Sequence, residues 1–288
     1  MEIQMFNGWY FLMLFICIGS VVGLYFILRN RTAKTQKIVL FCILLFGLIL
    51  HFLKCFIPPY STDIDRLYRD IFFVNICGAN IFLFPFIFLS KSDKAKDYMF
   101  YIGLLSGLIS IFYPMEPMAK VNQAAEWLDI VRFYFHHTML WAVPLLMVVF
   151  KLHKISYKRV LCAPTYLLVV MLFIIVNQVL QSELGFVPLR GDDLLNVNYK
   201  NSSMIWGPTG DIGEFLAVFC PNFFKTIPVG ELAGQAKYWP WFWLIFPVYI
   251  LVTPVAFLIA MIFDHKNFSS DIKALNLKLK EKFAKKKT

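Results

Sequence analysis

The chain has 288 residues, of which 59% are hydrophobic and 16% are charged, and its formal net charge at pH 7 is +10. Soluble domains are about 45–50% apolar and about 25% charged, so this composition excludes an ordinary water-soluble globule. The charged residues gather in short stretches, and the apolar runs between them are long enough to cross a bilayer. Because hydrocarbon offers the backbone no hydrogen-bond partners, each run is expected to be a helix.

The apolar runs predict an all-α, polytopic membrane protein with about seven transmembrane helices. In chain order we place the spans near residues 10–28, 38–56, 71–90, 98–113, 133–150, 160–182 and 241–263. The first run has no basic segment before it and no small-residue cleavage site, so we interpret it as a retained helix and not as a signal peptide. Residues 1–263 are therefore expected to form one transmembrane domain.

Lysine and arginine are divided unequally between the two ends of these spans. One side holds 19 of them, including the eight lysines that follow Asp264, and the other side holds 8. The positive-inside rule makes the richer side cytoplasmic, which puts the N-terminus outside and the C-terminus in the cytoplasm of a multi-pass plasma membrane protein. These charges lie in short connectors and one tail, not on a folded basic face, so nucleic acid is not an expected partner.

Two segments extend beyond the predicted helices. Residues 264–288 form a basic tail in which apolar residues recur among lysines, as in an amphipathic helix that lies on an anionic inner leaflet. Residues 183–237 form a long external loop, of a length typical of lids and binding elements. Its adjacent Asp192 and Asp193 lack the ligand spacing of a calcium loop, so we expect a solvated turn there.

Polar side chains within the predicted spans gather near their outer ends, in what we call the polar layer. Cys77 and His137 lie roughly 6–9 Å below the outer boundary of their spans. The other members of the layer are His51, Lys54, Asn75, Asn80, Asn177, Gln178 and Gln181. Intramembrane polar groups usually face a cavity or one another, which predicts a site enclosed by the second, third, fifth and sixth spans. The alternative, strongest near span ends, is that these groups snorkel or bond between helices.

Cys77 is the candidate nucleophile of the polar layer. A buried cysteine is ordinarily a small, inert apolar residue, whereas a neighbouring imidazole favours the reactive thiolate. His136 and His137 are adjacent and project about 100° apart on a helix, so only one of them can face the span that carries Cys77. Spacing alone leaves that choice open. The six cysteines form no CxxC pair and no cluster at zinc spacing, so no metal site is expected.

Several of these segments resemble a known family. The segment 74–80 (Val-Asn-Ile-Cys-Gly-Ala-Asn) and the segment 132–138 (Arg-Phe-Tyr-Phe-His-His-Thr) are similar to the cysteine and histidine segments of YwaF-type bacterial integral membrane proteins, which are related to the eukaryotic transmembrane protein 164 family of phospholipid acyltransferases. Asn198 and Tyr199 resemble the family's Asn-Tyr segment. Asn75 stands where family members often have a histidine.

The resemblance implies a reaction and a site. The matching cysteine of the eukaryotic relatives is implicated in acyl transfer, which implies Cys77 as the nucleophile and selects His137 as its base. The expected protein is thus a membrane acyltransferase, or acyl hydrolase, that acts on membrane lipids as acyl donors in the bacterial cell membrane and requires no metal or organic cofactor. The expected substrate-binding residues are His51, Lys54, Asn80, Asn177, Asn198 and Tyr199.

A second interpretation is a membrane transporter or substrate-binding membrane subunit. In that case the polar layer would bind a solute and the external loop would act as a gate. Transporters often contain internal repeats and helices interrupted near the midplane of the bilayer. The chain has no convincing repeat and its polar layer lies off-centre, so we favour acyl transfer.

The predicted topology can be tested with introduced cysteines. A cysteine near Arg190 should react with a membrane-impermeant thiol reagent on intact cells, whereas one near Lys285 should react only after the membrane is opened, because the positive-inside rule puts these positions on opposite sides. The parent protein, with its native cysteines, is the control. The reverse pattern would overturn the orientation.

Overall fold

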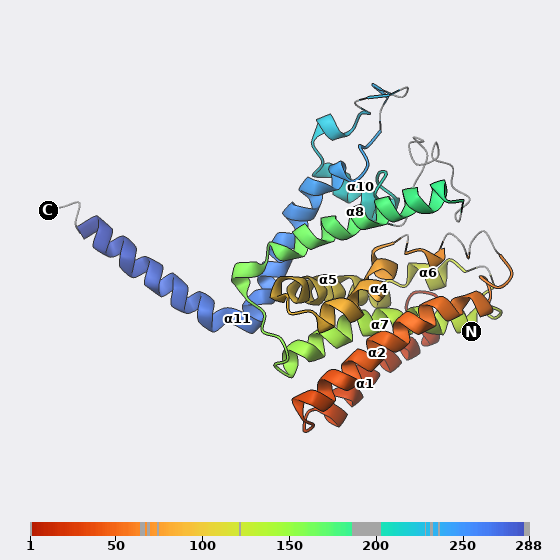
Figure 1. Cartoon of the computed structure of the whole chain (residues 1–288), viewed down its shortest axis with the longest axis horizontal. Coiled ribbons are helices and arrows are strands. Elements are labelled where there is room, and N and C mark those ends of the chain that lie inside the picture. The colour runs from red at the N-terminus through yellow and green to blue at the C-terminus, as the bar shows by residue number, and fades with distance from the viewer. Residues whose placement is uncertain are drawn as a thin grey trace.

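The computed structural model of the protein describes residues 2–63, 67, 70–73, 75–120, 122–185, 203–227, 229–230, 233–235 and 237–284. Within these ranges the chain is helical and contains no strand, which confirms the all-α fold class. The α-helices in chain order are α1 (Gly8–Leu28), α2 (Ala33–Leu53), α4 (Ile76–Leu89), α5 (Asp93–Phe112), α6 (Met115–Met118), α7 (Trp127–Val149), α8 (Cys162–Glu183), α10 (Gly210–Val218) and α11 (Ile245–Ala284) (Figure 1).

Six of the seven predicted spans overlap one long helix each, and the third overlaps the shorter α4. Among the described residues, five helical segments are long and apolar enough to cross a membrane, namely Gly8–Leu28, Ala33–Phe56, Asp93–Met118, Tyr157–Glu183 and Phe242–Lys280. The apolar helix α4 is shorter, and α7 has 23 residues, or about 34 Å, but carries several polar side chains. Five spans are thus supported by length and composition, while the crossings of α4 and α7 and the orientation stay predictions.

The segment predicted as the third span, 71–90, is not a single helix. Phe73 has a φ of 58°, in the left-handed region that non-glycine residues rarely adopt, and helix α4 begins only at Ile76. Asn75 is its N-cap, because its side-chain oxygen accepts a hydrogen bond from Gly78 N (2.6 Å). Cys77 therefore lies in the first turn of α4, not two turns inside a span as the sequence suggested.

Helix α5 lies at the centre of the bundle and packs against α4, α7 and α8. Its closest neighbour is α7, and two glycines permit this approach. A Cβ atom on Gly103 would lie 2.3 Å from the carbonyl oxygen of Leu140, and one on Gly107 would lie 2.7 Å from that of His137. Small residues at such crossings let membrane helices come into backbone contact. This backbone contact fixes α5 and α7 relative to each other, and α4 packs against both helices.

The outer faces of the bundle are strongly apolar. Large hydrophobic side chains are exposed along α1 and α2, among them Phe15 at 75% and Phe46 at 53%. Water would penalise so much exposed apolar surface, whereas a lipid environment accommodates it. The exposed faces thus support the membrane assignment independently of helix length.

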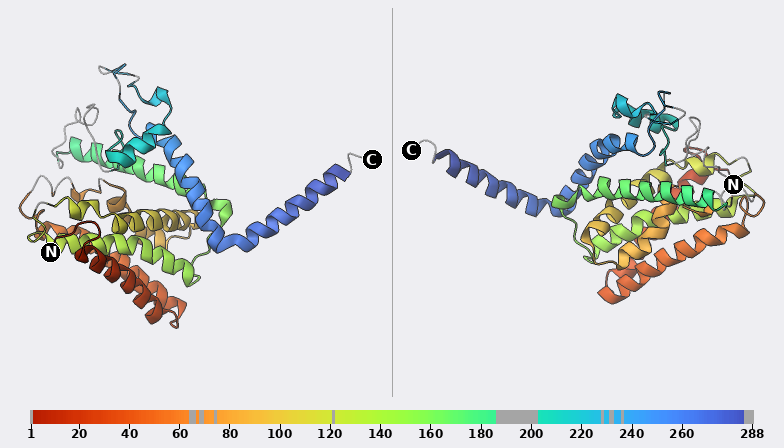
Figure 2. Two further views of the ribbon diagram at one scale, coloured as in Figure 1. Left: turned by 180° about the vertical axis from the view of Figure 1, so that it is seen from behind. Right: turned by 45° about the horizontal axis from the view of Figure 1, so that its top comes forward.

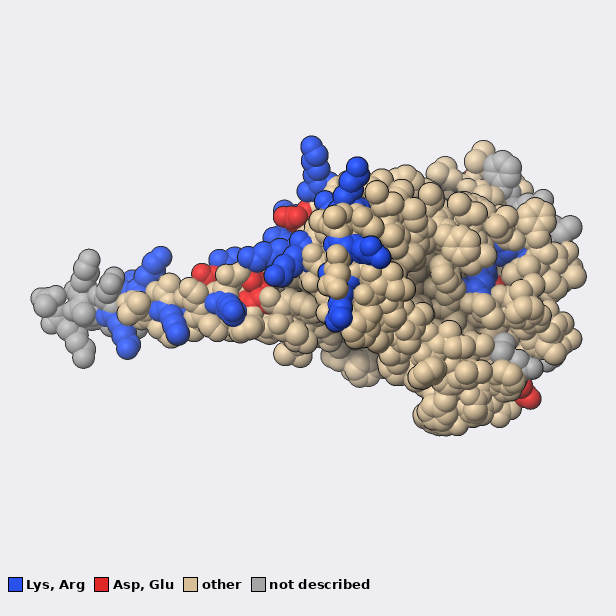
Figure 3. Space-filling view, turned by 90° about the horizontal axis from the view of Figure 1, so that it is seen from below, with Lys and Arg blue, Asp and Glu red and all other residues tan. Residues whose placement is uncertain are grey.

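The last helix continues past the bundle. Asp264 breaks the helical geometry of α11 (φ −127°, ψ 18°), and the helix then runs on to Ala284, pointing away from the other helices (Figures 1 and 2). Asp264 Oδ2 accepts a hydrogen bond from Tyr157 N (3.1 Å), which ties the kink to the connector before α8. The predicted tail is therefore helical, and its contact with the inner leaflet stays a prediction. Figure 3 shows Lys and Arg gathered at this end of the molecule.

The long loop of the prediction is only partly described, since residues 186–202 lie outside the described ranges. The remainder contains α10 and the short 3-10 helix Asn222–Phe224, with Phe215, Val218 and Phe223 exposed at 56%, 74% and 64%. Trp243 Nε1 donates to the carbonyl oxygen of Met204 (2.9 Å), which attaches this region to the start of the last helix. Exposed apolar side chains of this kind are suited to a membrane interface.

Candidate functional site

The candidate nucleophile, Cys77, lies at a helix N-terminus. The first N–H groups of an α-helix have no partner inside the helix, and they give this end a partial positive charge. Such a position favours negative charge on a cysteine sulfur, whereas burial in an apolar bundle opposes it. The Cys77 thiol is half-buried and faces α5, where the hydroxyl groups of Ser106 and Ser110 lie beside it. The surroundings of Cys77 are thus polar at short range within an apolar bundle.

Three side chains of the polar layer hold the backbone segment that leads to Cys77. Each donates to one of three consecutive carbonyl oxygens: Lys54 Nζ to Asp70 (2.5 Å), His51 Nε2 to Ile71 (3.2 Å) and Asn177 Nδ2 to Phe72. These carbonyls precede the irregular turn at Phe73, so they do not all have helical partners. An unpaired carbonyl in hydrocarbon costs several kcal/mol. We call this set of three bonds the carbonyl clamp.

The turn before α4 is also fixed by ring packing. The His51 ring stacks on the Phe73 ring at 4.9 Å and an interplanar angle of 19°. A left-handed conformation at a non-glycine residue costs of order 1–3 kcal/mol and persists only where the surroundings determine it. The ring stacking and the carbonyl clamp hold Phe73 in this conformation. The position of Cys77 therefore depends on side chains from α2 and α8.

A network of buried charges surrounds Arg132 in α7, which is 8% exposed. Its bonds run to three partners: Nε to Asp129 Oδ1 (2.6 Å), Nη1 to His136 Nδ1 (3.1 Å) and Nη2 to the Tyr60 hydroxyl (3.2 Å). Lys120 Nζ donates to the second oxygen of Asp129 (2.7 Å). Burial raises the pKa of Tyr60, so its hydroxyl stays protonated and its oxygen accepts from Arg132. Each of these buried charges thus has a partner of opposite charge.

The two adjacent histidines have different surroundings. His136 uses both ring nitrogens, since Nδ1 accepts from Arg132 and Nε2 donates to the carbonyl oxygen of Gly47 (2.9 Å). His137 Nδ1 donates to the carbonyl oxygen of Phe133 (2.8 Å), and no described residue bonds its Nε2. His137 therefore keeps one basic nitrogen, whereas His136 serves to join α2 and α7. No hydrogen bond joins His137 to Cys77 within the described part of the chain.

Asn80 lies one turn after Cys77 and is completely buried. Its Oδ1 accepts a hydrogen bond from the Tyr98 hydroxyl (2.6 Å). Its Nδ2 has no hydrogen-bond partner among the described residues. An unpaired buried donor is uncommon, and it is chemically suited to an acceptor that arrives with a ligand.

Comparison with known proteins identifies the family to which the chain belongs. A model of the TMEM164 family matches residues 4–263. The chain belongs to the TMEM164 family. The TMEM164 match covers the bundle and ends where α11 bends at Asp264. None of the curated proteins and none of the solved structures compared with the chain matches it.

The structure gives the contacts of several expected site residues in this TMEM164-family chain, while their roles toward a substrate stay predictions. Asn75, at the position where a histidine was expected from the resemblance, caps the helix that carries Cys77. His51, Lys54 and Asn177 lie near Cys77 but bond to backbone. The two remaining candidates, Asn198 and Tyr199, lie outside the described residues.

Sequence reasoning missed the two serines beside Cys77. Ser106 and Ser110 are spaced by four residues near the outer end of a predicted span, so they share one helix face. That spacing could have indicated a polar face on this span. Serine is common in membrane helices, however, and was not counted in the polar layer.

The charge network predicts a large effect on stability. Asp129→Asn should lower the free energy of unfolding by about 3–5 kcal/mol, because it removes the carboxylate nearest to the buried Arg132, whereas Lys120 keeps its ion pair with Glu126 (2.7 Å). Thermal unfolding of the detergent-solubilised protein measures this change. Asp211→Asn, at an exposed position of α10, is the matched control and should unfold like the parent. An unchanged transition in Asp129→Asn would mean that the network contributes nothing to stability.

Proposed function

We propose that the protein is an integral membrane lipid acyltransferase, or acyl hydrolase, with Cys77 as its nucleophile. The observation that carries the proposal is the position of Cys77 at the N-terminus of α4, where unused backbone N–H groups and fixed polar side chains surround one thiol. The resemblance of segment 74–80 to the cysteine segment of phospholipid acyltransferases supports acyl transfer as the reaction. TMEM164 family membership supports the membrane setting.

The proposed reaction has two steps. The Cys77 thiolate attacks the carbonyl carbon of a lipid ester, the carbon–sulfur bond forms, the ester carbon–oxygen bond breaks, and the lipid alcohol leaves with a proton. An acceptor hydroxyl, or water in a hydrolase, then attacks the thioester, releases the thiolate and receives the acyl group. No electrons are transferred, so no redox cofactor is needed for this balance.

His137 is the proposed proton carrier. Its unbonded Nε2 takes the proton of the thiol, returns it to the leaving alcohol, and then takes the proton of the acceptor. No hydrogen bond joins His137 to Cys77 within the described residues, and in the proposed reaction the two groups come together when lipid binds. Catalytic hydrogen bonds often tighten only when substrate binds.

The start of α4 provides donors for the oxyanion. Asn75 satisfies Gly78 N, which leaves the N–H groups of Ile76 and Cys77 without partners among the described residues. The unpaired Nδ2 of Asn80 is a third donor, one turn further along. Fixed donors of this kind stabilise the negative charge that develops on a carbonyl oxygen during acyl transfer.

The polar side chains around Cys77 then divide into two groups. His51 and Asn177 act through the carbonyl clamp as positioning residues. Lys54 uses one donor on the carbonyl oxygen of Asp70 and lies 5.1 Å from the centre of the Tyr60 ring. An ammonium group has three donors, so Lys54 keeps capacity for a lipid phosphate while it holds the backbone.

The proposal predicts the turnover of single and double variants. Cys77→Ala and His137→Ala should each abolish acyl turnover in folded protein, and the double variant should lose little more, because the two residues serve one step. Release of acyl groups from a radiolabelled lipid in reconstituted vesicles measures turnover. His136→Ala should reduce acyl turnover per folded molecule much less. Cys42→Ala, at an exposed cysteine, should turn over substrate like the parent.

Normal turnover of a verified lipid substrate by Cys77→Ala would contradict nucleophilic catalysis by this residue. Transport of a solute through the polar layer would then become the leading function.

A further inference from the structure

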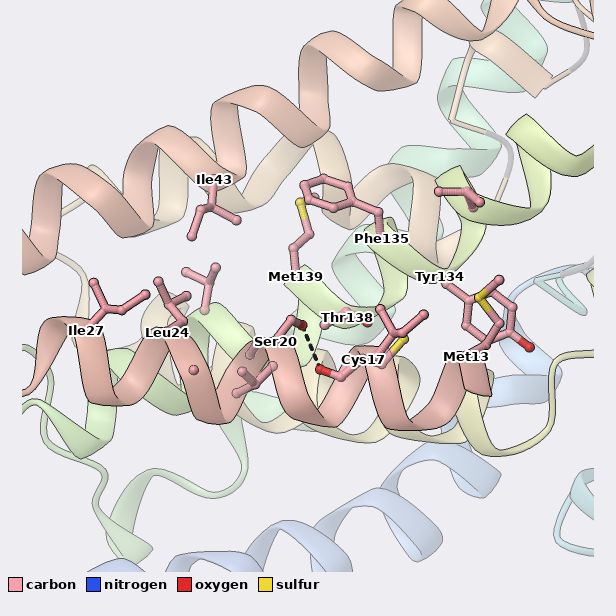
Figure 4. A pocket seen from close by; sticks show the side chains of 16 residues that line it. Met13, Cys17, Ser20, Leu24, Ile27, Ile43, Tyr134, Phe135, Thr138 and Met139 are labelled. Atoms are coloured by element: carbon pink, nitrogen blue, oxygen red, sulfur yellow. Dashed lines mark hydrogen bonds between the residues drawn. The ribbon is translucent and has the colours of Figure 1, made fainter. Parts of the chain in front are cut away.

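Two uncovered apolar surfaces of the protein differ in their charge. The first is the groove between α1, α2 and α7, where Leu24 and Ile27 face Ile43 (Figure 4). None of the described residues that line this groove is charged, so it resembles any lipid-facing helix surface and indicates no particular ligand. The second surface lies on the tail at the end of α11, where apolar side chains recur among lysines.

The structure divides the tail into two parts, and the first part is held by protein contacts. The Phe268 ring meets the ring of Tyr157 at 5.1 Å and that of Phe257 at 5.6 Å. The Asp271 carboxylate accepts a hydrogen bond from the Tyr157 hydroxyl (2.5 Å) and pairs with Lys158 Nζ (2.5 Å). These contacts fasten the first two turns of the tail to the connector before α8.

The second part of the tail has an uncovered apolar face. Ile272, Leu275 and Leu279 are 41%, 52% and 42% exposed. They follow Phe268 at steps of four, three and four residues, so all four side chains lie on one face of the helix. Phe268 is covered by protein, whereas the helix beyond it projects away from the bundle (Figures 1 and 2). We call Ile272, Leu275 and Leu279 the tail stripe.

The charges beside the tail stripe indicate what covers it. Residues 272–280 contain Lys273, Lys278 and Lys280 and no acidic residue. Figure 3 shows Lys and Arg side chains along this projecting helix. The three lysines would repel the same helix of a second copy, whereas they attract an anionic surface. An apolar stripe accompanied by lysines is typical of helices that lie in an anionic membrane interface.

The connection of the tail to α11 favours lipid over an acidic protein as this surface. Residues 245–263 contain no charged side chain and span about 28 Å as a helix, close to the roughly 30 Å of a hydrocarbon core. The bilayer surface is therefore expected near Asp264, and Ile272 lies within about 12 Å of that residue along the helix. Tethering at this distance gives the tail a high effective concentration at the leaflet.

We propose that residues 272–280 bind the anionic phospholipids of the leaflet at which α11 leaves the bilayer. The tail stripe enters the acyl region, and the lysines beside it contact lipid phosphates. The sequence alone treats residues 264–288 as a single amphipathic tail. The covered Phe268 and the paired Asp271 limit the proposed lipid contact to the part beyond Asp271. This surface does not depend on chemistry at Cys77.

Two leucines of the tail give a matched pair of variants. Leu275 belongs to the tail stripe, whereas Leu277 is 62% exposed and projects to the opposite side of the helix. Leu275→Asp puts a carboxylate into the proposed lipid contact. Leu277→Asp makes the same chemical change, with the same change in net charge, outside that contact.

The test is hydrogen exchange of the full-length protein in nanodiscs that hold one copy each, made of phosphatidylcholine alone or with added phosphatidylglycerol. A short helix without packing partners is marginal in water, so the amides of residues 272–280 exchange rapidly unless lipid holds the helix. Added phosphatidylglycerol should slow this exchange about tenfold. Leu275→Asp should abolish the slowing, and Leu277→Asp should keep most of it.

Two results would overturn the proposed lipid contact. One is exchange of residues 272–280 at the same rate in both lipid compositions. The other is an equal loss of slowing in the two leucine variants, which would show that net charge alone, without the tail stripe, governs the contact.

Discussion

The chain must satisfy its polar groups without water wherever its backbone is irregular near the bilayer. The segment before α4 is such a place, because Phe73 adopts a left-handed conformation and interrupts the helix. The carbonyl clamp from Lys54, His51 and Asn177 supplies the missing partners. Everything that makes Cys77 a candidate nucleophile depends on this constraint, since the clamp determines where α4 begins.

The same constraint explains the charges around Arg132. Isolated charges in an apolar bundle are costly, and here each is paired: Arg132 and Lys120 share the carboxylate of Asp129. His136 extends the network to the backbone of α2. The glycines of α5 bring α7 into backbone contact with α5, the helix that faces Cys77. The paired charges thus make the Arg132 region of the bundle an ordered polar network.

Hydropathy predicted the helices well because a membrane span has only one way to satisfy its backbone. It placed Cys77 six residues inside a continuous helix, because neither the capping role of Asn75 nor the turn at Phe73 is visible in average hydropathy. His51, Lys54 and Asn177 were predicted to bind substrate, which stays a prediction, and the structure shows that they also bond to backbone carbonyls. A sequence does not show which backbone carbonyls lack helical partners, so their bonds to residues 70–72 were not predictable.

The reactivity of the native cysteines tests the central claim most directly. A long-chain, lipid-like alkylating reagent applied to membranes reaches Cys42, which is exposed, more easily than Cys77, which is half-buried. If the N-terminus of α4 and its polar surroundings activate the thiol, mass spectrometry at short reaction times should find Cys77 modified ahead of Cys42. Modification of Cys42 first, with Cys77 unreacted, would show that exposure alone governs reactivity and would contradict an activated nucleophile at Cys77.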